Sequence, residues 1–295
     1  MTGAADDGAG VDDRCRRGEA LHVAFSPCPN DTFVFHAWVH GLIPDAPPVQ
    51  VSYADIDVTN AAAERGALAG DTTSRPLDVV KVSFAALPWL LRDYRLLPCG
   101  GAVGRGCGPL LLAREPLPSL AGRRIAVPST RSTAYLLLRL WADDVDLDIE
   151  VAPFAQIMPA VRAGRYDAGL VIHEARFTYP SYGLQALLDL GQWWESDTGL
   201  PIPLGAILAR RNRDAAAIAS VLRRSVEYAW ASPGASAAYV AAHADEMSPE
   251  VSAQHIALYV NEFTRDLGEE GYAAAETLLN RASRRGLVPD VPALR

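Results

Sequence analysis

The chain has 295 residues, of which 49% are hydrophobic and 21% charged, and its formal net charge at pH 7 is −8. This length allows one large domain or two lobes of ordinary size, each with its own core. The acidic balance argues against nucleic acid and anionic membranes as partners, because both attract basic surfaces. We therefore expect a globular protein that acts on a small molecule, with monomer and homodimer both left open.

Residues 1–19 are rich in Gly, Ala and Asp and contain no apolar run. A secretory signal needs roughly 7–15 apolar residues and a membrane helix about 20, so the sequence predicts neither. Cysteines occur at positions 15, 28, 99 and 107, with no C-x-x-C pair and no zinc spacing. Free thiols in a reducing compartment are the simplest interpretation. We expect a disordered tail over 1–19 and a cytoplasmic protein.

Strand and helix patterns alternate in the first third of the chain. Strands are expected over Leu21–Ser26, Val49–Tyr53 and Leu77–Val82, and helices over Thr32–His40, Asp57–Ala69 and Ser83–Leu91. The first helix is expected to open just after Asn30 or Asp31 as its cap. This order is typical of a parallel sheet with crossover helices.

A glycine-rich segment, 100–108, separates this run from a second one. It lacks the helix and the lysine that follow nucleotide-binding glycine loops, which favours a hinge or a close backbone approach. The later patterns predict strands over Pro109–Arg114, Arg124–Pro128, Ile149–Pro153, Tyr166–Ile172 and Leu204–Ala209, and helices over Ala134–Ala142, Ile157–Ala163, Ala215–Ser232, Pro249–Phe263 and Gly268–Arg285.

These elements predict an α/β protein of two lobes with C-terminal helices, an arrangement that resembles the type II periplasmic-binding-protein fold. Residues 20–105 and 209–295 are expected to form lobe one with the closing helices, and residues 106–208 lobe two. Ligands of such folds bind in the cleft between lobes, at the carboxyl ends of strands and the amino ends of helices.

Two polar segments lie at strand-to-helix junctions, where a helix amino end presents free N–H groups. In Ser26–Asp31, a rigid turn with a cap explains the residues as well as ligand contact does. In Ser129–Ala134, four hydroxyls exceed the need of one cap and favour ligand contact. Lys81 follows two valines in a buried strand, so it either extends to solvent or, with Ser83, faces an anionic or polyhydroxy ligand.

His173 directly follows the expected strand Tyr166–Ile172, so we expect it at the mouth of the cleft. Its ordinary pKa lies nearest neutrality among side chains, which makes it the natural proton acceptor. Glu174 or Arg176 could orient it or hold an acidic substrate. A structural histidine is the alternative interpretation.

Other chemistries receive weaker support. H-E-x-x-H would need a second histidine at position 177, where the chain has Phe. His36 and His40 are four residues apart on a helix, but no third ligand follows at matching spacing. Cys28 shows no activating base in the local sequence, so we do not expect it to be a nucleophile.

Four motifs in this order carry a resemblance to the 1,4-dihydroxy-6-naphthoate synthase family. They are SPCPNDTF at 26–33 with His40 and Gly41, GGAVGRGCGP at 100–109, IHEARFTYP at 172–180, and WWE at 193–195 followed by TGLPIPLG at 198–205. The resemblance covers about 21 to 285 and leaves out the tail. One departure is a 71–76 loop that is longer than usual for the family.

The resemblance implies a lyase of menaquinone biosynthesis that converts cyclic dehypoxanthine futalosine to 1,4-dihydroxy-6-naphthoate and a ribose-derived fragment. It implies no metal and no redox cofactor. It places the proton acceptor at His173 and substrate contacts at Lys81, Val82, Ser83, Thr133 and Ala134, to which the polar junctions add Asn30, Asp31 and Ser132. A solute-binding protein of the same fold, and a sister enzyme that dehydrates chorismate, are the alternatives.

Overall fold

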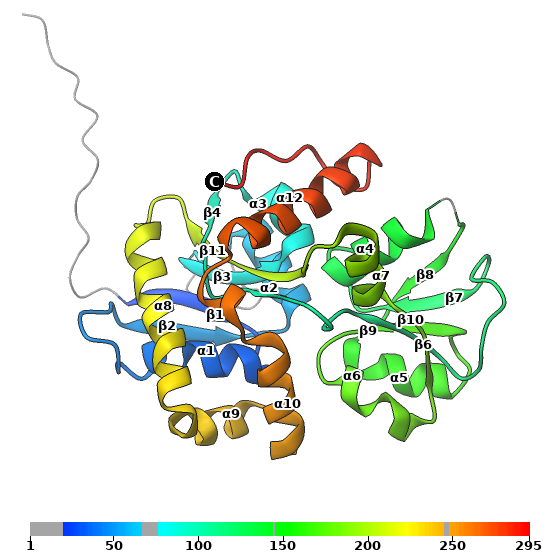
Figure 1. Cartoon of the computed structure of the whole chain (residues 1–295), viewed down its shortest axis with the longest axis horizontal. Helices are drawn as coiled ribbons and strands as arrows, with labels where there is room; N and C mark the ends of the chain where they lie inside the picture. Colours follow the sequence, from blue (N-terminus) through cyan, green and yellow to red (C-terminus); the bar gives the residue numbers. More distant parts are fainter. Residues whose placement is uncertain (1–19, 67–75, 144, 245–247) are drawn as a thin grey trace, which may run out of the picture.

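The computed structural model describes residues 20–66, 76–143, 145–244 and 248–295. The expected tail at 1–19 and most of the 71–76 loop lie outside these ranges. Two sheets, each covered by helices, lie side by side in the molecule (Figure 1). The prediction of an α/β fold with two lobes and C-terminal helices is confirmed, while the residues at which the chain crosses between lobes stay a prediction.

The first sheet has the strand order β2-β1-β3-β11-β4, with β5 also paired to β11. All five residues of β1 and of β3 are buried, as expected for mostly apolar strands covered on both faces. The strands are β1 (Leu21–Phe25), β2 (Val49–Tyr53), β3 (Val79–Ser83), β4 (Tyr94–Leu96), β5 (Ala102–Gly104) and β11 (Ile202–Arg210). The short strands β4 and β5 were not expected from the sequence.

Between the strands of the first sheet, the described N-terminal part of the chain forms four helical segments. They are α1 (Pro29–Val39), α2 (Ile56–Arg65), a short turn of 3-10 helix (Phe84–Ala86) and α3 (Leu87–Leu90). Phe35 of α1 stacks on Phe25 of β1 with ring centroids 4.3 Å apart, which anchors the helix on the sheet. α2 ends at Arg65 because Gly66 adopts the left-handed conformation of a helix terminus. The expected continuation over 67–69 lies outside the described residues.

The second sheet has the strand order β10-β6-β9-β7-β8. Its strands are β6 (Leu110–Ala113), β7 (Arg124–Val127), β8 (Asp148–Val151), β9 (Ala168–Val171) and β10 (Gln185–Asp189). Its helices are α4 (Thr133–Ala142), α5 (Phe154–Arg162), α6 (Ala175–Thr178) and α7 (Leu190–Thr198), with a 3-10 turn at Tyr179–Tyr182. The strand β10 and the helices α6 and α7 were not expected from the sequence.

The prediction of parallel sheets holds only within each βαβ run. β1 is parallel to β2 and β3, and β7 is parallel to β8 and β9. β11, however, is antiparallel to β3, and β6 is antiparallel to both β9 and β10. Both β6 and β11 belong to segments that pass between the two sheets rather than following a crossover helix on the same sheet, so no right-handed βαβ unit fixes their direction.

The glycine-rich segment, 100–108, brings backbones close together. Of its two interpretations, a hinge or a close backbone approach, the structure confirms the second. A side chain on Gly101 would lie 2.6 Å from the carbonyl oxygen of Gly205, and one on Gly108 would lie 2.1 Å from the backbone nitrogen of Gly191. Neither position could carry a Cβ atom without moving the neighbouring strand or helix. The segment therefore packs the crossing chain against β11 and α7.

The C-terminal helices are α8 (Ala215–Ala231), α9 (Ala237–His243), α10 (Pro249–Tyr259), α11 (Glu262–Arg265) and α12 (Gly268–Arg284), with a 3-10 turn at Pro233–Ser236. One helix over Pro249–Phe263 was expected, and this is wrong. Val260 leaves the helical backbone, and Asn261 caps α11 by accepting a hydrogen bond from the Phe263 N–H at 3.0 Å. No helix in the described ranges is long and apolar enough to cross a membrane.

Candidate active site

A pocket with about 580 Å³ of empty space is lined by residues of both halves of the molecule. It includes most of the residues that the sequence nominated: Asn30, Lys81, Ser83, Ser132, Thr133, Ala134 and His173. Val82 lies instead in the hydrophobic core below the pocket, because its side chain alternates to the opposite face of β3 from its neighbours. Asp31 is also outside the lining and contacts Lys81.

The start of α1 differs from the expected one. The helix begins at Pro29 with Cys28 as its cap residue, so the prediction of Asn30 or Asp31 as the cap is wrong. Proline is common at the first helical position, because an N–H there would have no partner within the helix and its absence costs nothing. Asn30 and Asp31 therefore lie inside the first turn, and their side chains are free to bind other groups.

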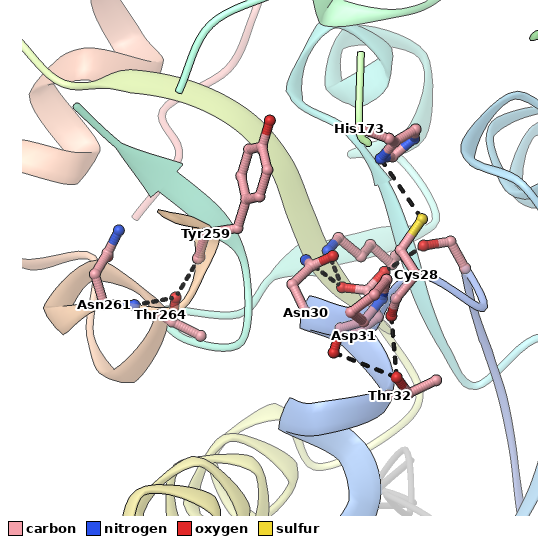
Figure 2. A network of polar contacts seen from close by, with 11 residues as sticks. Cys28, Asn30, Asp31, Thr32, His173, Tyr259, Asn261 and Thr264 are labelled. Carbon is pink, nitrogen blue, oxygen red and sulfur yellow. Dashed lines mark hydrogen bonds and ion pairs between the residues drawn. The ribbon is translucent and has the colours of Figure 1, made fainter. Parts of the chain in front are cut away.

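Asp31 is 1% exposed, and both oxygens of its carboxylate are engaged. Its Oδ1 accepts hydrogen bonds from Asn30 Nδ2 at 2.9 Å and from Lys81 Nζ, and its Oδ2 accepts one from Ser26 Oγ at 2.6 Å (Figure 2). The interpretation of Lys81 as a side chain that extends to solvent is excluded, because it is 5% exposed and ion-paired. This buried pair contributes a fixed, nearly neutral wall to the pocket.

Two neighbours define the space around this wall. A Cβ on Gly205 would lie 2.9 Å from Lys81 Cε, so glycine on β11 leaves the room that the lysine stem occupies. Asn60 of α2 donates from Nδ2 to Ser83 Oγ at 3.1 Å and accepts from the Ser83 N–H at 2.8 Å. Ser83 is thereby fixed at the end of β3, on the pocket lining.

The amino end of α4 faces the pocket from the other half of the molecule. Ser132 caps the helix and accepts the Tyr135 N–H at 3.1 Å. The Thr133 hydroxyl donates to the Leu204 carbonyl at 2.9 Å and accepts from the Ala85 N–H at 3.2 Å, so it ties α4 to the first half. The first N–H groups of a helix have no partner within it. The backbone N–H groups of Thr133 and Ala134 are therefore the groups that can bind an anion here.

His173 directly follows β9 and has a φ of +55°, in the left-handed region that non-glycine residues rarely occupy. The Arg176 N–H donates to the His173 carbonyl at 3.3 Å and closes a tight turn that leads into α6. Such backbone strain persists where the surrounding structure imposes it, which is common at functional sites. The turn presents the half-buried imidazole to the pocket.

Cys28 lies beside the His173 ring, with Sγ 3.5 Å from Nδ1 (Figure 2). The base that the local sequence of Cys28 lacked thus comes from 145 residues away, which sequence reasoning could not foresee. Burial lowers the pKa of His173, but the charge and hydrogen bond of Cys28, followed by the carboxylates of Glu174 and Asp31, raise it to about 9. With Nδ1 held by the sulfur, Nε2 is the nitrogen that can exchange a proton with a ligand.

His255 and Tyr259, both from α10, complete the lining, and sequence reasoning missed them. The His255 ring lies 6.3 Å from the His173 ring between centroids and 4.6 Å from the Tyr259 ring. Burial, helped by the positive charges of His173 and Lys81, lowers the pKa of His255 to about 3. Burial also raises the pKa of Tyr259. Both side chains are therefore neutral at physiological pH.

Glu174 and Arg176, the two residues that the sequence suggests as partners of His173, make different contacts. Arg176 donates to the Gly108 carbonyl and to Asp189 Oδ2, each at 2.7 Å, so its guanidinium joins α6 to the crossing segment. Glu174 directly precedes α6 and raises the pKa of His173 through its charge. Within the described ranges, no group of three or more His, Cys, Asp or Glu side chains has the geometry of a metal site.

The model of a family described as menaquinone biosynthesis matches residues 21–284. The chain is 59% identical to a 1,4-dihydroxy-6-naphthoate synthase of Streptomyces coelicolor, over 92% of this chain and 95% of that one. It is 47% identical to a 1,4-dihydroxy-6-naphthoate synthase of Thermus thermophilus, over 93% and 98% of the respective chains.

Among solved structures, the periplasmic aliphatic sulphonate binding protein of Escherichia coli is similar in fold, with a TM-score of 0.64. The two chains share 16% sequence identity, and the similarity covers 94% of this chain and 91% of that one. At this identity the comparison concerns the fold alone, and it confirms the expected likeness to periplasmic binding proteins.

Proposed function

This chain belongs to the menaquinone biosynthesis family, and from that premise we propose that it converts cyclic dehypoxanthine futalosine to 1,4-dihydroxy-6-naphthoate, with His173 as the general base. The observation that carries the proposal is a histidine at the carboxyl end of β9 whose Nδ1 contacts Cys28 and whose Nε2 has no partner among the described residues, in a pocket lined by residues of both lobes. We place the reaction in the cytoplasm, which agrees with the free Cys28, Cys99 and Cys107.

In this mechanism Nε2 of His173 removes a proton next to a carbonyl of the substrate. The electron pair of the broken C–H bond forms an enolate and then expels the sugar-derived fragment. Formation of the aromatic naphthalene system drives the cleavage. Cys28 supports the step by accepting the Nδ1–H, because this tautomer leaves the lone pair on Nε2. Positioned proton transfer of this kind accelerates a reaction about 10²- to 10⁴-fold.

The developing enolate needs stabilisation close to the base. The N–H groups of Thr133 and Ala134 point from the start of α4, where the helix dipole adds positive potential. Preorganised donors of this type stabilise an oxyanion more than water does, because they need no reorganisation during the reaction. We therefore propose that α4 binds the oxygen that gains charge when His173 takes the proton.

The test is direct conversion by the purified protein. Cyclic dehypoxanthine futalosine is added, and formation of 1,4-dihydroxy-6-naphthoate is followed by chromatography with mass detection. Product formation would support the proposed function. Binding without turnover would favour a solute-binding protein, and dehydration of chorismate in a parallel incubation would favour the sister enzyme.

A further inference from the structure

One buried side chain of the pocket has no part in the mechanism above. His255 is 1% exposed and lines the pocket together with Tyr259, one helical turn further along α10. Within the described ranges, neither Nδ1 nor Nε2 of His255 has a hydrogen-bond partner. Buried polar atoms of folded proteins are nearly always paired. An unpaired ring on a pocket wall therefore indicates that a ligand supplies its partners.

The other buried histidines do not share this property. The Nε2 atom of His22 lies 2.9 Å from Ser52 Oγ, which leaves only Nδ1 unpaired. His36 has an unpaired buried Nδ1 as well, but its ring packs against His40 and Tyr239 outside the pocket. Across the described part of the chain, His255 is thus the histidine that combines near-complete burial, two unpaired nitrogens and a place on the pocket wall.

We propose that His255, together with the hydroxyl of the neighbouring Tyr259, binds the hydroxyl-bearing, sugar-derived part of the substrate. A neutral imidazole has one donor and one acceptor nitrogen, so it needs an acceptor and a donor from its ligand. Hydroxyl groups supply both, whereas a carboxylate supplies acceptors only. The inference rests on the proposed function, because it assigns one part of that substrate to one wall of the pocket.

The position of α10 gives this contact a consequence for the reaction. The His255 and His173 rings lie 6.3 Å apart between centroids, with planes only 24° from parallel. A sugar-derived fragment held by His255 therefore lies next to the proton acceptor, where its bond to the rest of the substrate breaks. His255 would position the departing fragment, while His173 performs the proton transfer.

The test replaces His255 with Phe, which keeps a planar ring against Tyr259 but removes both nitrogens. We expect the KM for cyclic dehypoxanthine futalosine to rise about 10- to 100-fold, the size expected for one or two lost hydrogen bonds in a buried site. The inhibition constant of added 1,4-dihydroxy-6-naphthoate should stay within about twofold, because this product lacks the sugar-derived part. Tyr259→Phe should show the same selectivity with a smaller rise in KM.

His36→Phe is the matched control, since it also replaces a buried histidine but lies outside the pocket. We expect it to leave the KM and the product inhibition constant unchanged. Ligand-free His255→Phe protein should melt at the wild-type temperature or higher, because replacing unpaired buried polar atoms with apolar ones costs no native hydrogen bond. A purely structural histidine would instead show a lower Tm.

Three results would overturn the inference: an unchanged KM in His255→Phe, an equal loss of product binding, or a Tm lowered by several degrees in the ligand-free variant. Wild-type protein that forms no naphthoate would contradict the proposed function instead. In that case the Tm of ligand-free His255→Phe, compared with that of the wild type, still shows whether His255 stabilises the fold or serves to bind a ligand.

Discussion

Behind the pocket wall formed by α1 and β3, Asp31 is 1% exposed and both carboxylate oxygens accept hydrogen bonds, from Ser26, Asn30 and Lys81. On the wall formed by α10, His255 is equally buried, yet both ring nitrogens are unpaired within the described chain. The first wall is complete without a ligand and the second is not. The difference teaches which polar groups of a pocket maintain the fold and which are kept for a substrate.

The largest effect on stability is expected from breaking the complete wall. Asp31→Asn leaves the Lys81 ammonium buried without a counter-charge, so the free energy of unfolding should fall by about 3–5 kcal/mol. Urea denaturation followed by circular dichroism measures the change. The double variant Asp31→Asn/Lys81→Met should recover much of the loss, because it removes the unpaired charge as well. A double variant as unstable as the single one would contradict this account of the wall.

The next largest effect is expected on the pH dependence of activity, which is set by His173. His173 must be neutral to accept a proton, and its pKa is raised to about 9, so kcat/KM should rise with pH and level off above that value. Cys28→Ser removes the sulfur whose charge and hydrogen bond raise the pKa of His173, so the inflection should move to lower pH. Rate measurements from about pH 6 to about pH 10 test this. An inflection at the same pH in both proteins would show that the sulfur does not control the ring.

The smallest effect should come from the hydroxyl that ties the walls together. Thr133→Val removes the bonds to the Leu204 carbonyl and the Ala85 N–H, and should lower stability by about 1–3 kcal/mol. The kcat should change little, because the backbone N–H of residue 133 remains. Thermal melting and steady-state rates measure the two quantities, with Thr133→Ser as the control that keeps a hydroxyl. Normal stability with lost activity would mean that the hydroxyl binds substrate.

Local sequence was sufficient for residues whose place follows from one element. His173 comes directly after a buried apolar strand, and the carboxyl ends of strands in α/β lobes face the cleft. The same reasoning brought Lys81, Ser83 and the start of α4 to the pocket lining. It also predicted both βαβ runs, because their hydrophobic patterns and turn residues agree with each other.

Local sequence was insufficient wherever distant segments meet. The pattern around His255 indicates a helix but not which face of that helix meets residues of both lobes. Local sequence predicts a cap or a ligand contact for Asp31, because nothing near it reveals that Lys81, 50 residues later, forms an ion pair with it. The antiparallel direction of β11 depends likewise on how the chain returns from the other lobe. These features are decided by tertiary packing, which overrides local pattern.

The central claim, that His173 takes the proton, is tested most directly by chemical rescue of His173→Gly. Glycine accepts the φ of +55° without strain and leaves a space where the ring was, so fold and substrate binding should be preserved. We expect naphthoate formation to fall about 10²- to 10⁴-fold and to be partly restored by added imidazole, in proportion to its neutral form. A variant that turns over at the wild-type rate without imidazole would contradict the account.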